Sequence, residues 1–357
     1  MTAERTRPSA RIAVAMSGGV DSSVAAALLV AEGQDVLGIT MDVLPSGPRS
    51  AEPIAAARAA ARALGIEHVV VELREVFARL VIEPFCRAYR AGRTPNPCVE
   101  CNRHIKFGAL LERARELGAE WLATGHYARV GFDQARGRWT LRTGADAAKD
   151  QSYVLYGLTQ EQLSRARFPL GGMTKAEVRE RARRLSLPAW ERPESQQACF
   201  VGDAYGAFLE RWLTDAVRPG PIVDRAGRQV GRHRGIAFYT IGQRHGLRIA
   251  RGRPWYVVAI DATANRIIVG EESELRASRL RMTAVNYVSL AGLPEGGASF
   301  RAKVRSAAPA APCTARAQGA AVTLEFTRPQ RAIAPGQSAV CYDQDVVALG
   351  GVIDAAW

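Results

Sequence analysis

The first half of the chain alternates between short apolar runs and longer segments whose apolar residues recur at helical spacing. The short runs are typical of buried strands, and the longer segments are typical of helices with one buried face. The predicted strands lie at 12–16, 36–41, 68–73 and 121–124, and the predicted helices at 22–32, 51–64, 75–90 and 105–117. This alternation predicts an α/β fold, a parallel sheet with helices on both faces, over residues 1–215.

The pattern changes after residue 215, and the 357 residues are enough for two or three domains. Proline and glycine now separate short alternating segments, which is typical of β structure. We expect a small β-rich domain over 216–275, with strands at 237–241 and 256–260, and an antiparallel barrel over 276–357, with strands at 321–326 and 338–342. The first domain should also contain a hairpin over 127–143, a basic helix over 173–185 and a loop to Cys199, and 307–312 should be a loop.

A glycine-rich motif joins the first predicted strand to the first predicted helix. Ser17–Ser23 reads Ser-Gly-Gly-Val-Asp-Ser-Ser. Gly18 and Gly19 allow close approach of the backbone to an anion, and the free N–H groups at the helix start point toward the same place. Asp21 beside a phosphate site indicates Mg²⁺, and no Walker A lysine follows. The motif resembles the PP-loop of ATP pyrophosphatases; the alternative is a glycine turn that only caps a helix.

The cysteines form the second candidate for chemistry. Six are too few for a disulfide framework, so a close pair indicates redox, sulfur or metal chemistry. Cys98 and Cys101 follow two prolines, which predict an extended loop, and Asn102 is expected to cap a helix that begins near His104. Cys101 near a helix start and basic residues would favour the thiolate. Cys199 lies in a polar loop, although a buried structural thiol is the alternative.

The formal net charge is +13, and 44 of the 48 basic residues are arginine. Eight arginines and one acid lie between Asp224 and Arg253, which is typical of a surface that binds a polyanion. An arginine-rich surface that only reflects overall composition is the alternative. The chain has no stretch long enough to span a membrane and no secretory signal at its start, so we expect a cytoplasmic protein without a membrane partner.

Further motifs follow in order along the chain. They read Thr-Gly-His-Tyr-Ala-Arg from Thr124, Lys-Asp-Gln-Ser-Tyr from Lys149, Pro-Leu-Gly-Gly-Met-Thr-Lys ending at Lys175, Ser-Gln-Gln-Ala-Cys-Phe around Cys199, Tyr-Thr-Ile-Gly-Gln-Arg-His-Gly-Leu from Tyr239, and Pro-Gly-Gln ending at Gln337. With Ser17–Ser23 and the Asn96–Asn102 segment, which reads Asn-Pro-Cys-Val-Glu-Cys-Asn, this series resembles the bacterial tRNA-specific 2-thiouridylase family over nearly the whole chain.

The resemblance implies ATP-dependent adenylation of O2 of the wobble uridine in lysine-, glutamate- and glutamine-type tRNAs, followed by replacement of that oxygen by sulfur. It makes Cys101 the nucleophile and Cys199 the persulfide carrier, which a sulfur-relay protein or a cysteine desulfurase would load. The two would form a disulfide after each turnover. It implies ATP contacts by Ala15, Met16, Ser17, Gly18, Gly19, Val20, Asp21, Ser22, Met41 and Gly125. It implies tRNA contacts by Asn96, Pro97, Cys98, His126, Lys149, Asp150, Gln151 and Gln337.

One residue departs from the family pattern. Many relatives have aspartate where this chain has Cys98, so an acid–base role at this position does not carry over. Cys98, Cys101 and Cys199 could instead hold three corners of a [4Fe–4S] cluster whose fourth iron site would deliver hydrosulfide. The other motifs favour the persulfide route, and the cluster route stays open.

Two other functions fit parts of the chain. A PP-loop ligase of another kind, such as an amidating synthetase, would need an ammonia source, and the sequence shows no glutaminase domain. A tRNA-binding protein with a relic nucleotide site would not need Asp21 or the cysteine pair. Pyrophosphate release from ATP that depends on tRNA separates these alternatives.

Overall fold

The computed structural model describes residues 10–45, 47–188, 190, 199–200, 208, 212–213, 217–249 and 254–357. The chain divides into two compact units. The first contains residues 1–80 and 100–194, and the second contains residues 81–99 and 195–357. Residues 81–99 thus group with the second unit, although the sequence pattern placed them in the N-terminal domain.

The first unit is built on a five-stranded parallel sheet in the order β3-β2-β1-β4-β7. Its centre is buried on both faces, which explains why the strands read as continuous apolar runs. The four long strands match the predicted ones to within two residues at every end. The strands are β1 (Arg11–Ala15), β2 (Val36–Asp42), β3 (Glu67–Glu72), β4 (Ala119–Ala123) and β7 (Ala166–Arg167).

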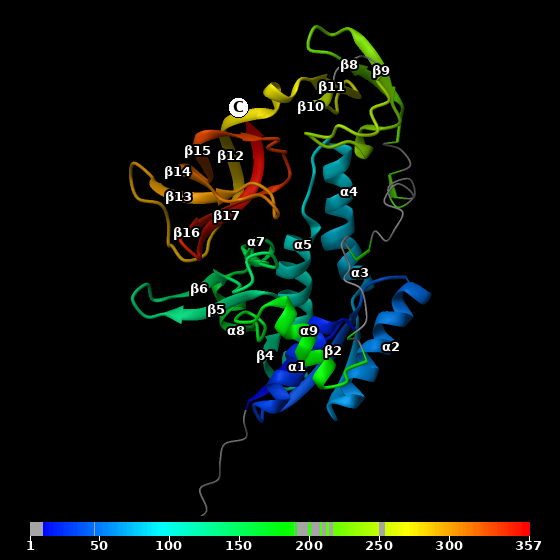
Figure 1. Cartoon of the computed structure of the whole chain (residues 1–357), viewed down its shortest axis with the longest axis vertical. Coiled ribbons are helices and arrows are strands. Elements are labelled where there is room, and N and C mark those ends of the chain that lie inside the picture. The colour runs from blue at the N-terminus through cyan, green and yellow to red at the C-terminus, as the bar shows by residue number, and fades with distance from the viewer. Residues whose placement is uncertain are drawn as a thin grey trace, which may run out of the picture. The chain divides into compact units, whose positions relative to one another are not determined.

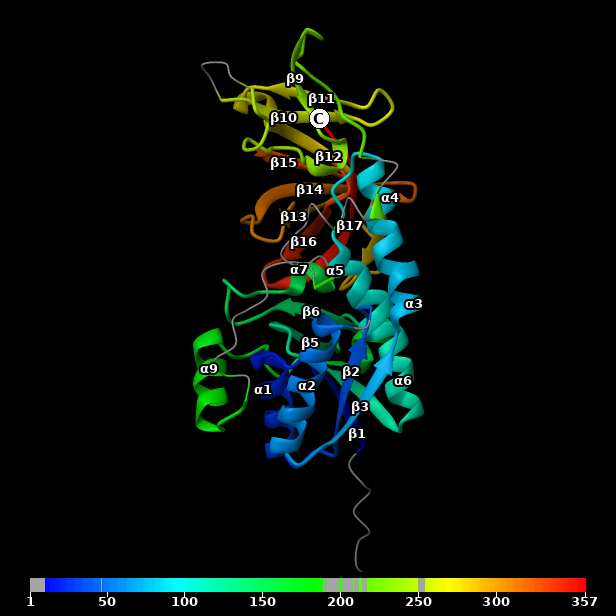
Figure 2. The ribbon, with the colours of Figure 1, turned by 90° about the vertical axis from the view of Figure 1, so that its right-hand side faces the viewer.

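Helices cover both faces of this sheet, as predicted (Figure 2). On one face α1 (Val20–Ala31), α2 (Pro48–Ala63) and α9 (Lys175–Arg184) share a core of small and branched apolar side chains. On the other face lie α3 (Arg74–Phe77) and the run formed by η2 (Cys101–Leu110) and α6 (Leu111–Glu116). None of the helices in the described ranges is both long and apolar enough to cross a membrane.

The predicted hairpin over 127–143 is confirmed as the antiparallel pair β5 (Ala128–Asp133) and β6 (Arg138–Thr143). Two short helices, α7 (Ser152–Leu155) and α8 (Gln160–Arg165), lead from the hairpin back to β7. The basic helix expected over 173–185 is α9, which begins after a capping box between Thr174 and Glu177.

The second unit contains a four-stranded mixed sheet in the order β10-β11-β8-β9. Residues 237–241, predicted as a strand, do not form one: Ala237 and Phe238 belong to the short 3-10 helix η3 (Ile236–Phe238), and 239–241 form no strand. The Phe238 and Tyr239 N–H groups donate to the Gly235 and Ile236 carbonyls, three residues back, so the segment turns on itself and does not pair with a neighbouring strand. The strands of this sheet are β8 (Gly220–Val223), β9 (Gln229–His233), β10 (Tyr256–Asp261) and β11 (Arg266–Gly270), and the unit also contains α4 (Glu83–Arg90) and η4 (Glu272–Leu275). The π-helical segment η1 (Ala78–Ile82) contains the boundary between the two units, after Leu80.

The predicted antiparallel barrel is confirmed (Figure 1). Its strands follow the order β12-β15-β14-β13-β16-β17, and pairing between β12 and β17 closes it, so no edge of this sheet is left open. The predicted loop over 307–312 ends two residues early, at residue 310, because β14 begins at Ala311. The strands are β12 (Arg276–Tyr287), β13 (Ala298–Lys303), β14 (Ala311–Gln318), β15 (Ala321–Arg331), β16 (Ser338–Asp343) and β17 (Val346–Ala356).

Candidate nucleotide and thiol site

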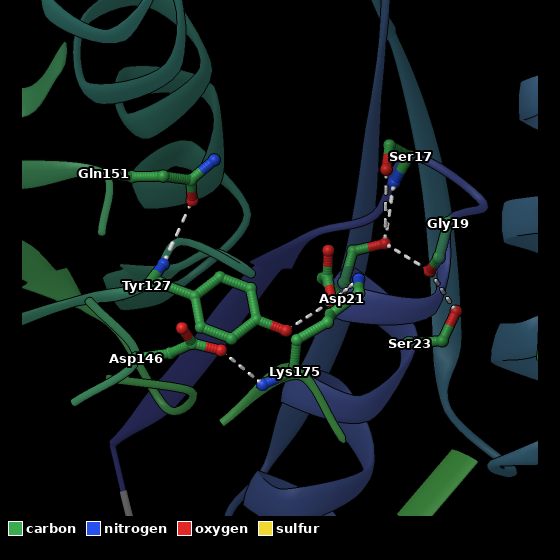
Figure 3. Close-up of polar contacts among 9 residues, drawn as sticks. Ser17, Gly19, Asp21, Ser23, Tyr127, Asp146, Gln151 and Lys175 are labelled. Atoms are coloured by element: carbon green, nitrogen blue, oxygen red, sulfur yellow. Dashed lines mark hydrogen bonds and ion pairs between the residues drawn. The ribbon is translucent and has the colours of Figure 1, made fainter. Parts of the chain in front are cut away.

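The turn between β1 and α1 is a compact, hydrogen-bonded loop. The Ser22 hydroxyl donates to the Gly19 carbonyl oxygen at 3.1 Å and accepts from the Ser17 backbone N–H at 3.1 Å, while Ser23 Oγ donates to the same carbonyl at 3.0 Å (Figure 3). Gly18 has a φ of +72°, and a Cβ there would lie 2.7 Å from the Pro53 carbonyl oxygen. The loop therefore needs glycine to pack against α2.

Asp21 is the charged centre of this loop. Its Oδ1 accepts a hydrogen bond from the Tyr127 hydroxyl at 2.8 Å and pairs with the Lys175 ammonium at 2.7 Å (Figure 3). These partners come from the segment after β4 and from the first turn of α9, so three sequence motifs meet on one carboxylate oxygen. The Lys175 side chain is only 11% exposed, and Asp21 supplies the charge that a buried ammonium requires.

Neighbouring motif residues hold these partners in place. The Lys175 backbone N–H donates to Asp146 Oδ2 at 3.0 Å, and this bond is the main reason why the pKa of Asp146 lies below its ordinary value. The Tyr127 backbone N–H donates to Gln151 Oε1 at 3.0 Å, and the Gln151 N–H donates to the Tyr127 carbonyl at 2.9 Å. The lysine and the tyrosine are therefore fixed at their backbones.

The other predicted ATP residues lie at or near the ends of β1, β2 and β4 and at the start of α1, and their ATP contacts stay predictions. Ala15 ends β1, Met16 is buried and donates its N–H to the Ile39 carbonyl at 2.8 Å, and Met41 lies next to the end of β2. Gly125 follows β4, and a Cβ there would lie 2.8 Å from Asp21 C and from Ser22 N. Gly125 therefore allows β4 to approach the first turn of α1.

His126 lies inside the first unit. Its ring is buried, Nδ1 lies 2.7 Å from Thr124 Oγ1, and Nε2 lies 3.4 Å from the Lys106 ammonium. Burial, and then the charge of Lys106, hold the pKa of His126 well below 6.5, so the imidazole is neutral. Its predicted tRNA contact stays a prediction.

The Lys149–Gln151 motif contributes to the framework of the same unit. Asp150 Oδ1 accepts the backbone N–H groups of Gly144 and Ser152, and its Oδ2 accepts the Ser152 hydroxyl. The Lys149 backbone N–H donates to the Asp146 carbonyl at 3.1 Å. The tRNA contacts proposed for Lys149, Asp150 and Gln151 stay predictions.

The cysteine segment is helical where an extended loop was expected. Asn96 Oδ1 accepts the Cys98 backbone N–H at 3.2 Å and caps the short helix α5 (Pro97–Glu100), in which Pro97 takes the first position. Cys98 is exposed and Cys101, the first residue of η2, is buried. The helix begins earlier than predicted because proline is well suited to a first helical position.

Asn102 is not the helix cap that the sequence predicted. It is buried in the π-helical segment η2, and its Nδ2 donates to the Val154 carbonyl at 3.0 Å. Sequence analysis also missed Gln162, whose Nε2 donates to the Arg103 and Phe107 carbonyls at 2.7 and 2.9 Å. Both amides stabilise a wide helical turn of the kind that often occurs at functional sites.

Cys199 belongs to the second unit. Its side chain is exposed, whereas the next residue, Phe200, is buried with its ring 5.3 Å from the rings of Phe85 and Phe208. The rest of the motif, Ser195–Ala198, lies outside the described residues. Within the described part of the chain, no three His, Cys, Asp or Glu side chains are placed to hold a metal ion. The cluster on Cys98, Cys101 and Cys199 stays a prediction.

Gln337 lies at the barrel, and its Nε2 donates to the Thr94 carbonyl at 3.1 Å, while the Thr94 N–H donates to the Pro335 carbonyl at 2.8 Å. The barrel and the segment before α5 are therefore joined within the second unit, next to Asn96. The predicted tRNA contact of Gln337 remains a prediction.

The arginine-rich stretch follows the central sheet. Arg228 pairs with Asp224, and Arg225 pairs with Glu274. Arg232 is exposed, and the exposed Arg234 places its guanidinium 4.0 Å from the Phe238 ring centroid. Arg251 and Arg253 lie outside the described residues.

Comparison with known proteins covers all three regions. Family models described as tRNA methyl transferase HUP domain, tRNA methyl transferase PRC-barrel domain and aminomethyltransferase beta-barrel domain match residues 10–203, 206–271 and 277–353. The tRNA-specific 2-thiouridylase MnmA of Heliobacterium modesticaldum is 48% identical over 96% of this chain and 92% of its own. The chain belongs to the MnmA family.

Another relative is similarly close. The tRNA-specific 2-thiouridylase MnmA of Moorella thermoacetica is 47% identical over 96% of this chain and 99% of its own. A solved NMN synthetase from Francisella tularensis matches 58% of this MnmA-family chain and 78% of its own, at 18% identity and a TM-score of 0.35.

Proposed function

We propose that this chain is a tRNA-specific 2-thiouridylase that uses ATP to activate O2 of the wobble uridine and then replaces that oxygen with sulfur. The observation that carries the proposal is the loop from Ser17 to Ser23, centred on Asp21, in the same compact unit as Cys101. Close relatives named as 2-thiouridylases over nearly their full length support it. The substrates would be tRNAs of the lysine, glutamate and glutamine type.

The residues of the loop fit a magnesium-bound triphosphate. Helix α1 begins directly after Gly19, so its first N–H groups are available to an anion, and the exposed Ser17 adds a hydroxyl. Asp21 offers the oxygen ligand that Mg²⁺ prefers. When bound there, Mg²⁺ would neutralise charge on the leaving pyrophosphate. The chain itself would hold the α-phosphate against the uridine and exclude water from it.

The cysteines fit the second half of the reaction. In the proposal, Cys199 receives a sulfur atom as a persulfide, and its exposed position suits a donor protein, either a sulfur-relay protein or a cysteine desulfurase. The terminal sulfur attacks C2 of the adenylated uridine and AMP leaves. The Cys101 thiolate then attacks Cys199 Sγ, which leaves sulfur on the base and forms a disulfide that a cellular thiol reduces.

The family models carry the words methyl transferase, whereas the curated relatives carry the name 2-thiouridylase. A loop built to hold phosphate groups beside a carboxylate favours the ATP-dependent reaction. We further infer that the protein works in the cytoplasm, where its tRNA substrates are found.

The experiment is nucleoside analysis of tRNA incubated with full-length protein, ATP, Mg²⁺ and a persulfide donor. We expect 2-thiouridine, AMP and pyrophosphate from the wild type. Cys101→Ala and Cys199→Ala should each abolish 2-thiouridine while tRNA-dependent pyrophosphate release continues, and Cys98→Asp should retain both. Pyrophosphate release without tRNA, or none with it, would contradict the proposal. Stoichiometric iron in an anaerobic preparation would favour the cluster route if Cys98→Ala loses both the iron and the activity. That result would contradict the persulfide route.

A further inference from the structure

Lys175 neutralises the charge of Asp21 in the structure. Its ammonium lies 2.7 Å from Asp21 Oδ1, the same oxygen that the Tyr127 hydroxyl approaches to 2.8 Å. The Lys175 side chain is 11% exposed and that of Asp21 is 33% exposed, so the ammonium is more shielded from solvent than the carboxylate. A buried ammonium without a counter-charge is costly, and Asp21 removes that cost.

The pair lies at an anion site. Asp21 is the second residue of α1, and Lys175 is the first residue of α9, a ten-residue helix. A triphosphate bound at the start of α1 would bring several negative charges close to the ammonium, against the single charge of the carboxylate. The electrostatic energy would then favour contact between Lys175 and phosphate oxygens. Asp21 would lose its cation at the moment when Mg²⁺ arrives with the nucleotide.

The side chain at position 175 is suited to change partners. A lysine ammonium is a compact charge on a flexible four-carbon stem, whereas an arginine fork would hold the carboxylate at two points. The backbone of Lys175 is fixed through Asp146, so only the stem needs to move. Tyr127 is fixed through Gln151 and can keep Asp21 oriented during the exchange.

We propose that Lys175 is a catalytic residue of the adenylation step that exchanges Asp21 for phosphate oxygens. In the free protein it occupies the cation position on Asp21; with magnesium and ATP it contacts the pyrophosphate that leaves. Uridine O2 forms the new bond to the α-phosphorus, and the bond from that phosphorus to the bridging oxygen breaks with its electron pair going to pyrophosphate. Lys175 keeps its proton throughout. This inference rests on the proposed function.

The test measures Mn²⁺, a paramagnetic substitute for Mg²⁺, by electron paramagnetic resonance on full-length protein without ATP. We expect Lys175→Met to bind Mn²⁺ on the order of tenfold more tightly than the wild type, because Asp21 loses its competing cation. The double variant Lys175→Met with Asp21→Asn should lose this gain. Lys175→Arg keeps a cation on Asp21 and should bind Mn²⁺ no more tightly than the wild type, and the barrel control Lys303→Met should bind it like the wild type.

Pyrophosphate release with tRNA provides the second measurement. We expect a loss on the order of 10²–10³-fold in Lys175→Met, with wild-type release in Lys303→Met. A folded Lys175→Met protein with unchanged or weaker Mn²⁺ binding, or with normal pyrophosphate release, would overturn the inference. Lys175→Gln replaces it if the methionine variant does not fold. A wild type that forms no 2-thiouridine would overturn the proposed function and leave the Mn²⁺ comparison intact.

Discussion

Substituting Gly125 by alanine would test whether this residue acts through packing or only through the nucleotide. The sequence resemblance assigns it to ATP, but the structure places it directly against the Ser17–Ser23 loop. A methyl group at Gly125 would lie 2.8 Å from Asp21 C and from Ser22 N, well inside van der Waals contact. Both are backbone atoms of the first turn of α1, so no side-chain rotation can make room.

The expected loss of stability follows from this close contact. Overpacking a tightly packed site costs about 1–3 kcal/mol. Since 1 kcal/mol shifts the Tm of a domain of 150–250 residues by about 2–4 °C, the Tm of Gly125→Ala should fall by roughly 2–12 °C. Displacement of the first N–H groups of α1 should also weaken ATP binding on the order of tenfold, equivalent to about 1.4 kcal/mol.

The assay combines thermal unfolding of the ATP-free protein with calorimetric titration of ATP. Gly131→Ala is the matched control, because it lies in β5 and a Cβ there meets no atom within 4 Å. Its Tm should stay level or rise, since glycine in a strand interior costs about 0.5–1 kcal/mol relative to alanine. If Gly125→Ala keeps the wild-type Tm and loses only ATP affinity, the packing argument is refuted and a direct nucleotide contact is favoured.

Two further predictions concern tRNA and pH. The affinity for tRNA should fall steeply as the salt concentration rises. In filter-binding titrations, replacing Arg232 and Arg234 by alanine should reduce the slope of log K against log salt concentration by about 2. An unchanged slope would exclude these two arginines from the tRNA interface. The unfolding free energy should decline as pH falls below 6.5, because burial lowers the pKa of His126, so that the unfolded chain binds a proton that the folded protein does not. Denaturant titrations at several pH values should show that His126→Gln flattens this decline; an equal slope in both proteins would contradict it.

The sequence alone predicted those elements of the fold that depend on the local pattern of apolar, glycine and serine residues. The four long strands of the parallel sheet and the antiparallel barrel follow from apolar spacing, whereas the two-residue β7 was not predicted. Ser17–Ser23 could be assigned to a strand–helix turn because glycine and serine have defined roles there. The contacts of Asp21 could not be read in this way. Tyr127 lies 106 positions and Lys175 lies 154 positions further along the chain, so only the folded unit brings them together.

The cysteine segment was misread for a local reason. Its two prolines predict an extended loop, although proline also fits the first position of a helix. Asn96 directly precedes Pro97 and is therefore the better candidate for the helix N-cap. The sequence pattern had assigned that role to Asn102. The buried amide of Asn102 and the two bonds of Gln162 depend on carbonyl groups of η2 and α7, which no sequence spacing reveals.

The distribution of lysine supports a special role for its few positions. Of 48 basic residues only four are lysine, so arginine evidently serves wherever a positive surface charge is enough. Lys106 lies beside the neutral, buried ring of His126, and the buried Lys175 pairs with Asp21, so each lysine places a compact ammonium in a confined position. A guanidinium is planar and carries several fixed donors, some of which would remain unsatisfied in such a place. Lysine at these positions is therefore explained by the size and mobility of its charge, which is the property that exchange between a carboxylate and a phosphate requires.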